Sequence, residues 1–222
     1  MILVFDLDEV LYDEITFVKS GLDAVSNYLY TEFSIPRKKS KHYLDKRLRK
    51  GREGILDDLL HEFGLYSKKR VKRCLSVYRF HRPKIQLYED ANDCLKRLKK
   101  FPMYIVSDGN KIVQKNKLLA LKLFQRVDHC YLTSNYGLQH AKPSPYCFLK
   151  ICRRENVKPS EVIYIADNPN KDFVGIKPLG FKTIRLLKGR YKNLKKAKKF
   201  EAEFTIKTLS QLNFHFLKKL NG

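Results

Sequence analysis

Short runs of consecutive apolar residues recur along the chain. Continuous apolar runs are typical of parallel strands that are covered by helices on both faces. Each run predicts one strand. The runs lie at residues 2–5, 103–106, 130–132, 162–166 and 183–187. A last strand is expected at residues 203–206. The sequence therefore predicts a sheet whose central strands are buried.

Segments with a helical spacing of apolar residues separate these strands. They lie at residues 91–100, 111–124, 145–154 and 209–220. Strands that alternate with helices predict an α/β fold, in which a Rossmann-like parallel sheet has helices on both faces.

Residues 13–85 break this alternation, because they contain no comparable apolar run and carry many charges. Helices are expected in this segment at residues 14–32, 41–50 and 55–63, with a fourth that begins at a capping Ser67 and runs to residue 80. We therefore expect an α-helical domain at residues 13–85. It would be inserted into an α/β core domain formed by residues 1–12 and 86–222.

The composition fits a folded, globular chain. Hydrophobic residues make up 43% and aromatic residues 12% of its 222 residues, which is too apolar for general disorder. The N-terminus has no signal-peptide pattern, and no apolar run approaches the roughly 18 residues of a membrane span. We therefore expect a cytoplasmic protein with no membrane partner. The five cysteines form no C-x-x-C pair, so neither a disulfide framework nor a zinc site is expected.

The chain is strongly basic, with 46 lysine and arginine residues, 23 acidic residues and a net charge of +23. A charge of this size is typical of proteins that bind nucleic acids or anionic membranes. The basic clusters are spread over the whole chain, however, which favours solvated basic faces. Attraction of a small anionic substrate is the next interpretation, and nucleic acid is the least favoured partner. No pattern predicts an oligomeric state.

Two acidic residues follow the first predicted strand. Asp6 stands at its carboxyl end, where a side chain is exposed and fixed in direction, which suits a nucleophile or a metal ligand. Asp8 can approach the same centre. One carboxylate could then attack phosphorus while the other protonates the leaving oxygen and later activates water. Because D-x-D alone is common in loops and turns, this interpretation depends on the patches that follow.

Two further patches offer phosphate-binding groups. Ser107 follows the strand at 103–106, and the turn that contains Asp108 offers backbone N–H groups near the start of the next helix. Lys142 lies in a segment stiffened by prolines, and its charge could neutralise phosphate and keep Asp6 ionised. Alone, such a serine is more often a helix cap, and such a lysine is usually a surface residue.

The last patch is acidic. Asp167 and Asp172 follow the strand at 162–166 and offer oxygen ligands at a third strand end. Hard oxygen ligands suit Mg²⁺, which would also screen the repulsion between Asp6 and an incoming phosphate dianion. Together the four patches predict a magnesium-dependent phosphoryl-transfer site.

In order and spacing, these patches resemble the four motifs of the haloacid dehalogenase (HAD) superfamily. The matching residues are Asp6 to Val10 for the first motif, Ser107 for the second, Lys142 for the third and Asp167 to Asp172 for the fourth. The resemblance covers essentially the whole chain. One departure is Ala166, which stands where glycine often precedes the aspartate of the fourth motif.

The resemblance implies a mechanism and a set of roles. Asp6 would form an aspartyl-phosphate, Asp8 would be the general acid and base, and Ser107 and Lys142 would bind phosphate. The implied ligands of Mg²⁺ are Asp6, the backbone carbonyl of Asp8, Asp167 and, directly or through water, Asp172. The family's dehalogenases lack the second aspartate, so Asp8 favours phosphoryl transfer over cleavage of a carbon–halogen bond.

The inserted helical domain resembles the C1 cap of subfamily I of the superfamily. Such a lid closes over the site, excludes water and admits only substrates that fit beneath it. The first candidate for a specificity residue is Arg52, which lies between Gly51 and Gly54, and Arg79 and His81 are weaker candidates. A solvated or core-packed role is the alternative for all three.

The sequence thus predicts a HAD-like phosphatase, a Mg²⁺-dependent phosphomonoester hydrolase. Its substrate would be a small phosphorylated metabolite, such as a sugar phosphate or a nucleotide monophosphate. A phosphomutase of the β-phosphoglucomutase type is the first alternative, because it needs the same Asp6 and Asp8. The alternative from another class is a non-catalytic nucleic-acid-binding protein on a HAD scaffold, and the intact motifs argue against it.

Overall fold

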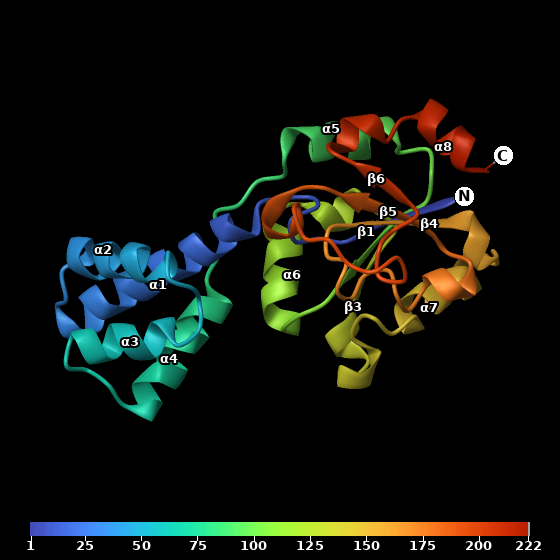
Figure 1. The fold of residues 1–222 in the computed structure, drawn as a ribbon. Helices are drawn as coiled ribbons and strands as arrows, with labels where there is room; N and C mark the ends of the chain where they lie inside the picture. Colours follow the sequence, from blue (N-terminus) through green and yellow to red (C-terminus); the bar gives the residue numbers. More distant parts are fainter. Residues whose placement is uncertain (222) are drawn as a thin grey trace. The chain divides into compact units, whose positions relative to one another are not determined.

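Six parallel strands form one sheet within residues 1–221, which the computed structural model describes. They are β1 (Ile2–Phe5), β2 (Met103–Ser107), β3 (His129–Leu132), β4 (Val162–Ala166), β5 (Lys182–Leu186) and β6 (Phe204–Ile206). Their order across the sheet is β3-β2-β1-β4-β5-β6, so β1 lies between β2 and β4 (Figure 1). The predicted α/β fold with a parallel sheet is confirmed.

The register of the central strands brings their carboxyl ends together. Phe5 of β1 lies opposite Ile105 of β2 and Ile165 of β4. All residues of these three strands are buried, which explains why each reads as a continuous apolar run. The chain segments that follow them therefore emerge at one edge of the sheet.

Four α-helices flank this sheet in the described part of the core. They are α5 (Glu89–Arg97), α6 (Lys111–Ala120), α7 (Tyr146–Glu155) and α8 (Phe214–Asn221). In Figure 1, α5 and α8 lie together on one side of the sheet, and α7 lies on the opposite side. Phe148 and Ile151 of α7 belong to one buried cluster with Val4 and Tyr164 of the sheet, so the apolar face of α7 covers the strands that lead to the site.

Short 3₁₀ helices complete the connections. They are η1 (Leu123–Gln125), η2 (Thr133–Asn135), η3 (Leu138–His140), η4 (Pro159–Glu161), η5 (Lys177–Leu179), η6 (Gly189–Tyr191) and η7 (Leu209–Gln211).

The chain divides into two units. The core unit comprises Met1–Glu14 and Gln86–Gly222, and the helical unit comprises Ile15–Ile85. The helices between β1 and α5 are α1 (Glu14–Phe33), α2 (Arg37–Leu48), α3 (Ile55–Glu62) and α4 (Lys68–Phe80). They bury a cluster of their own that includes Leu29 and Leu59. The helical unit therefore has an apolar core separate from that of the sheet.

Local signals set the ends of these helices. Ser67 accepts a hydrogen bond from the backbone N–H of Arg70, as expected for the N-cap of α4. Gly54 adopts a left-handed conformation with φ of 66° immediately before α3, a position that glycine occupies without steric cost. No helix within residues 1–221 is long and apolar enough to cross a membrane.

Candidate active site

The candidate site lies at the carboxyl edge of the three central strands. Asp6 follows β1, Ser107 is the last residue of β2, and Asp167 follows β4. The backbone N–H of Asp6 still donates to the carbonyl of Ile165 at 2.9 Å, which fixes the direction of the Asp6 side chain. Because β2, β1 and β4 are adjacent and parallel, these side chains meet at one edge.

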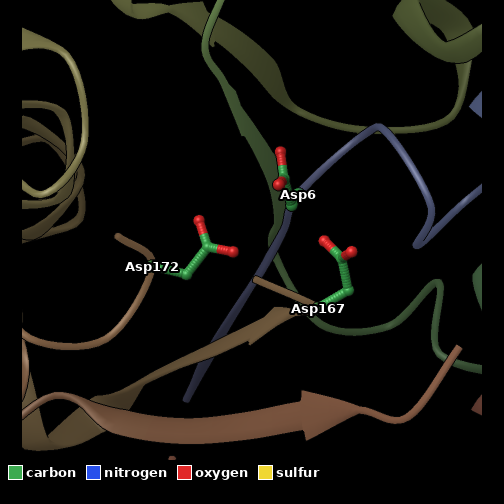
Figure 2. A group of neighbouring side chains, drawn as sticks. All are labelled: Asp6, Asp167 and Asp172. Carbon is green, nitrogen blue, oxygen red and sulfur yellow. The ribbon is translucent and has the colours of Figure 1, made fainter. Parts of the chain in front are cut away.

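Three buried carboxylates converge there (Figure 2). Asp6, Asp167 and Asp172 each place one carboxylate oxygen within 4.8 Å of the others. Asp167 Oδ2 is buried and has no hydrogen-bond partner among the described residues. A buried carboxylate oxygen without a partner is costly unless a cation satisfies it. This all-oxygen cluster fits a hard divalent metal ion.

Burial and the neighbouring negative charges raise the pKa of Asp6 and of Asp167. Burial, against the opposing charge of Lys142, raises the pKa of Asp6 to about 6. Burial and the charges of Asp6 and Asp172 raise the pKa of Asp167 to about 8. A metal ion that binds here therefore displaces the proton that Asp167 otherwise holds at neutral pH.

Lys142 carries a buried positive charge between two of these carboxylates. Its Nζ lies 2.9 Å from Asp6 Oδ2 and 2.8 Å from Asp172 Oδ1, and it donates to Tyr164 OH at 2.9 Å. Burial acts to lower the pKa of Lys142, but the charges of Asp172 and Asp6 outweigh it and raise that pKa well above its usual value. Lys142 is therefore a fixed cation that orients Asp6.

Three of the described residues donate hydrogen bonds to the carboxylate of Asp8. Its Oδ1 lies 2.7 Å from Lys117 Nζ and 2.5 Å from Tyr12 OH, and its Oδ2 lies 3.0 Å from Gln114 Nε2. Burial acts to raise the pKa of Asp8, but the charge of Lys117 and these hydrogen bonds outweigh it and lower that pKa. The pKa values of Asp6 and Asp8 are thus shifted in opposite directions, as in carboxylate pairs that divide two catalytic roles.

Ser107 and Asp108, the predicted phosphate-binding residues at the end of β2, make different contacts. Ser107 Oγ accepts from Gln114 Nε2 at 2.5 Å, which leaves the hydroxyl hydrogen to donate elsewhere. The carboxylate of Asp108 instead binds within the protein. Its donors are Thr133 Oγ1 at 2.8 Å, the backbone N–H of Lys142 at 3.1 Å and Lys171 Nζ at 2.7 Å. A phosphate contact by Asp108 would therefore use its backbone N–H.

A cavity of about 200 Å³ opens over these groups, and the core unit alone forms it. Its walls include the predicted Asp6, Asp8 and Asp167, together with Lys171 and Arg190. Acidic walls suit a metal ion, and basic walls suit the oxygens of a phosphate.

The three candidate specificity residues belong to the helical unit. Arg52 is exposed and lines a second cavity, of about 280 Å³, which residues of the helical unit form. Arg79 is partly buried on α4. His81 Nδ1 lies 2.7 Å from Tyr78 O and His81 Nε2 lies 3.1 Å from Ser20 Oγ, so both ring nitrogens are hydrogen-bonded within that unit. The roles of all three in specificity stay predictions.

The sequence analysis missed several residues that contact the site, among them Tyr12, Gln114, Lys117 and Lys171. The signal for Gln114 and Lys117 lies in their spacing. They share a helical stripe with Leu118 and Leu121, and all four side chains are buried. Two polar residues on a buried stripe indicate a polar partner at the other end of their side chains.

Comparison with known proteins identifies the family. A model of the haloacid dehalogenase-like hydrolase family matches residues 1–180. The chain belongs to this family. The resemblance inferred from the four motifs is therefore confirmed.

Two curated relatives are named glyceraldehyde 3-phosphate phosphatase. The protein from Methanocaldococcus jannaschii is 27% identical over 220 residues, which cover 95% of this chain and 94% of that protein. The protein from Pyrococcus furiosus is 29% identical over 231 residues, which cover 100% of this chain and 94% of that protein. A third relative, (S)-2-haloacid dehalogenase 1 from a Pseudomonas species, is 32% identical over 134 residues, 59% of this chain and 56% of its own.

The fold also matches solved structures of the family. The HAD-hydrolase YfnB from Bacillus subtilis, bound to magnesium, has a TM-score of 0.66 at 19% identity, with 97% of both chains covered. At this identity the match shows the shared fold.

Proposed function

We propose that the chain is a Mg²⁺-dependent phosphatase that hydrolyses a small phosphorylated metabolite through an aspartyl-phosphate. The observation that carries the proposal is the pair of carboxylates at the end of β1. Asp6 belongs to the metal-binding cluster, and Asp8, two residues on, belongs to a separate set of hydrogen-bond donors. One carboxylate is thus placed to attack phosphorus and the other to transfer protons.

In the first step, a carboxylate oxygen of Asp6 attacks phosphorus, and the bond between phosphorus and the ester oxygen breaks. Asp8 enters this step in its protonated form and gives that proton to the leaving alkoxide oxygen. The Lys142 ammonium, 2.9 Å from Asp6, and the Ser107 hydroxyl bind phosphoryl oxygens and offset the negative charge that gathers on them.

In the second step, Asp8 accepts a proton from a water molecule as the water oxygen attacks phosphorus. The bond between Asp6 and phosphorus breaks, so that inorganic phosphate leaves and Asp6 is restored. Each residue therefore ends the cycle in the state in which it began.

The residues that would hold Mg²⁺ are Asp6, Asp167, Asp172 and the backbone carbonyl of Asp8. Asp167 Oδ2, which is buried and has no partner in the described part of the chain, supports this assignment. When bound, the ion would act as a Lewis acid on a phosphoryl oxygen and screen the phosphate from the carboxylates.

The two relatives that match over nearly their whole length have names that suggest a substrate class. We infer that the substrate is a short phosphorylated aldehyde or sugar, with glyceraldehyde 3-phosphate as the first compound to test. The helical unit would act as a C1-type cap that selects the organic part of the substrate.

Release of inorganic phosphate from a panel of phosphate esters tests the proposal. We expect turnover by the wild-type protein with Mg²⁺, none in EDTA, and none by Asp6→Asn, because an amide is a poor nucleophile. Full activity in EDTA would overturn the metal assignment, and an active Asp6→Asn would overturn the nucleophile.

The same panel, extended by a 2-haloacid and by a binding assay with nucleic acid, separates the alternatives. A phosphomutase would return the phosphoryl group to a sugar phosphate and release little phosphate, whereas a dehalogenase would release halide from a 2-haloacid. The match to a dehalogenase favours testing the second reaction, although Asp8 argues for phosphoryl transfer. Binding of nucleic acid without turnover would be recognised by its steep salt dependence.

A further inference from the structure

Lys117 is a buried cation on α6 that the proposed mechanism has not used. It is 3% exposed, and its ammonium lies 2.7 Å from Asp8 Oδ1. A lysine at this depth is destabilising unless an anion compensates its charge. The aspartate that compensates it belongs to the first motif, so α6 is electrostatically tied to the proton-transferring group.

The donors around Asp8 are divided unequally between its two oxygens. Within the described residues 1–221, Oδ1 accepts hydrogen bonds from Lys117 Nζ and Tyr12 OH, whereas Oδ2 accepts one from Gln114 Nε2 alone. Each carboxylate oxygen accepts about two hydrogen bonds. Oδ1 is therefore filled, and Oδ2 keeps one acceptor position.

Gln114 fixes the orientation of this arrangement. Its Nε2 lies 3.0 Å from Asp8 Oδ2 and 2.5 Å from Ser107 Oγ. Because a carboxylate can only accept a hydrogen bond when ionised, the amide must turn its NH₂ group towards Asp8. One side chain thus holds Asp8 and the predicted phosphate-binding Ser107 at the same time.

We propose that Lys117, with Tyr12, is a positioning residue that reserves Oδ2 of Asp8 for proton transfer. The inference rests on the proposed phosphatase function. In the form of Asp8 that carries a proton, the proton occupies the remaining position on Oδ2. As the phosphorus–ester bond breaks and the bond from Asp6 forms, this proton moves to the leaving oxygen, and Lys117 holds the carboxylate that remains. In hydrolysis, Oδ2 takes the proton of the attacking water.

The structure also predicts which step of the reaction slows when Lys117 is lost. Without its ammonium, Oδ1 has a vacant acceptor position, so the two oxygens of Asp8 become nearly equivalent and the carboxylate can rotate. Proton transfer should suffer, whereas phosphate binding by Lys142 should not, since Lys142 contacts Asp6 and Asp172 instead. A leaving group that needs no proton therefore distinguishes a positioning role from a structural one.

The experiment compares Lys117→Met with the wild-type protein on an alkyl phosphate and on 4-nitrophenyl phosphate. We expect kcat for the alkyl ester to fall by roughly 10²-fold, a sizeable part of the usual contribution of general acid–base catalysis. Formation of the aspartyl-phosphate from 4-nitrophenyl phosphate should be nearly unchanged, because nitrophenolate leaves without a proton. Its hydrolysis should be slow, so the phosphorylated protein should accumulate and be seen by intact-mass measurement.

Two further variants complete the test. Lys115→Met makes the same substitution at an exposed position of α6 and should behave as the wild type. Tyr12→Phe removes the second donor to Oδ1 and should reproduce the Lys117→Met pattern to a smaller degree, which also covers the case in which Lys117→Met does not fold.

The outcomes separate this inference from the proposed function. Equal losses on both esters without accumulation of phosphorylated protein would overturn the positioning role, as would unchanged kinetics in both Lys117→Met and Tyr12→Phe. Absence of turnover by the wild-type protein on every ester would overturn the phosphatase function itself, and the role of Lys117 with it.

Discussion

Lys142 offsets the charges of two carboxylates that are almost fully buried, Asp6 and Asp172. Lys142→Met should lower the free energy of unfolding of the metal-free protein by about 3–5 kcal/mol, because it leaves buried charge without a partner. Mg²⁺ should restore part of this loss, since the ion supplies positive charge to the same carboxylates. Urea unfolding in EDTA and in Mg²⁺ measures both effects.

Lys171→Met is the matched control for this substitution. Lys171 also pairs with an aspartate, Asp108, but it is 34% exposed, and pairs of this kind contribute about 0.2–1 kcal/mol. Equal losses from the two variants would contradict the idea that the charge of Lys142 is buried and required.

The raised pKa values of Asp6 and Asp167, about 6 and about 8, predict the pH dependence of the metal-free protein. Both lie above the value of about 3.9 for an unfolded aspartate, so the folded state binds more protons. The stability from these groups is present below pH 4 and is lost as the pH rises through 6 and 8. Unfolding measured from pH 5 to 9 in EDTA should show this decline.

Two comparisons check that these carboxyls cause the decline. Asp167→Asn should remove the part that extends towards pH 8, because the amide does not titrate. Mg²⁺ should also flatten the profile, since it displaces the protons. A decline that persists unchanged in both conditions would place its origin elsewhere in the protein.

The N-cap of helix α6 is Asn110, whose side chain accepts hydrogen bonds from the backbone N–H groups of Ile112 and Val113. Asn110→Ala should cost about 1 kcal/mol of stability, the usual effect of losing an N-cap. It should also lower kcat, because α6 carries Gln114 and Lys117 to Asp8. Ser67→Ala removes the N-cap of α4 and should lower stability with a smaller change in kcat. The opposite ranking in kcat would show that the start of α6 does not support the site.

Gly175 lies in the connection after β4. Its backbone approaches Pro143, the residue that follows Lys142. A Cβ at this position would lie 1.7 Å from the backbone carbonyl of Pro143, so the two segments would have to separate. Gly175→Ala should cost about 1–3 kcal/mol and lower kcat by displacing Lys142. Gly180→Ala is the control, because a Cβ there meets nothing within 4 Å, and its effect should be confined to its left-handed backbone. Equal kcat losses would argue against the close approach at Pro143.

The sequence predicted the elements of the sheet better than the ends of the helices. Buried strands are continuous apolar runs, so β1 and β4 coincide with their predicted ranges. The helix expected at 111–124 ends instead at Ala120, because Lys122 adopts a left-handed conformation with φ of 55°. The helix expected from residue 209 begins only at Phe214, since residues 209–211 form the 3₁₀ helix η7. Apolar spacing does not register such breaks in the backbone.

The candidate site was also predicted only in part from the sequence. Asp6, Lys142 and Asp172 lie together, as the motifs predicted. Each belongs to a loop near the end of a strand, and the apolar runs of the sequence locate these strands. Lys117 and Tyr12 were missed, since their part in the site depends on which residue their buried side chains reach. That information exists only once the helix is packed on the sheet.

The proposed cap function concerns the whole molecule, and Arg52 is its test. If Arg52 reads the organic part of the substrate, Arg52→Ala should lower kcat/KM for the best substrate by about 10-fold to 100-fold, as the loss of a charged hydrogen bond implies. Turnover of 4-nitrophenyl phosphate should change far less. Lys50→Ala, at an exposed position in the same loop region, should leave both substrates unaffected.

Equal losses on the two substrates would instead assign Arg52 to the stability of the helical unit. No loss on either substrate would return it to the solvated basic surface that accompanies the net charge of +23.

The central place of β1 also sets the order in which the protein can assemble during synthesis. Leu3 pairs with Met103 and Ile163, so the strand that leads to the proposed nucleophile leaves the ribosome long before either neighbour. The contacts that define the helical unit lie within residues 15–85. This unit can therefore fold while β1 is still unpaired, because local contacts form before distant ones. A nascent chain arrested near residue 150 would thus carry a folded helical unit and no catalytic edge, and hydrolysis would begin only after β4 has joined the sheet.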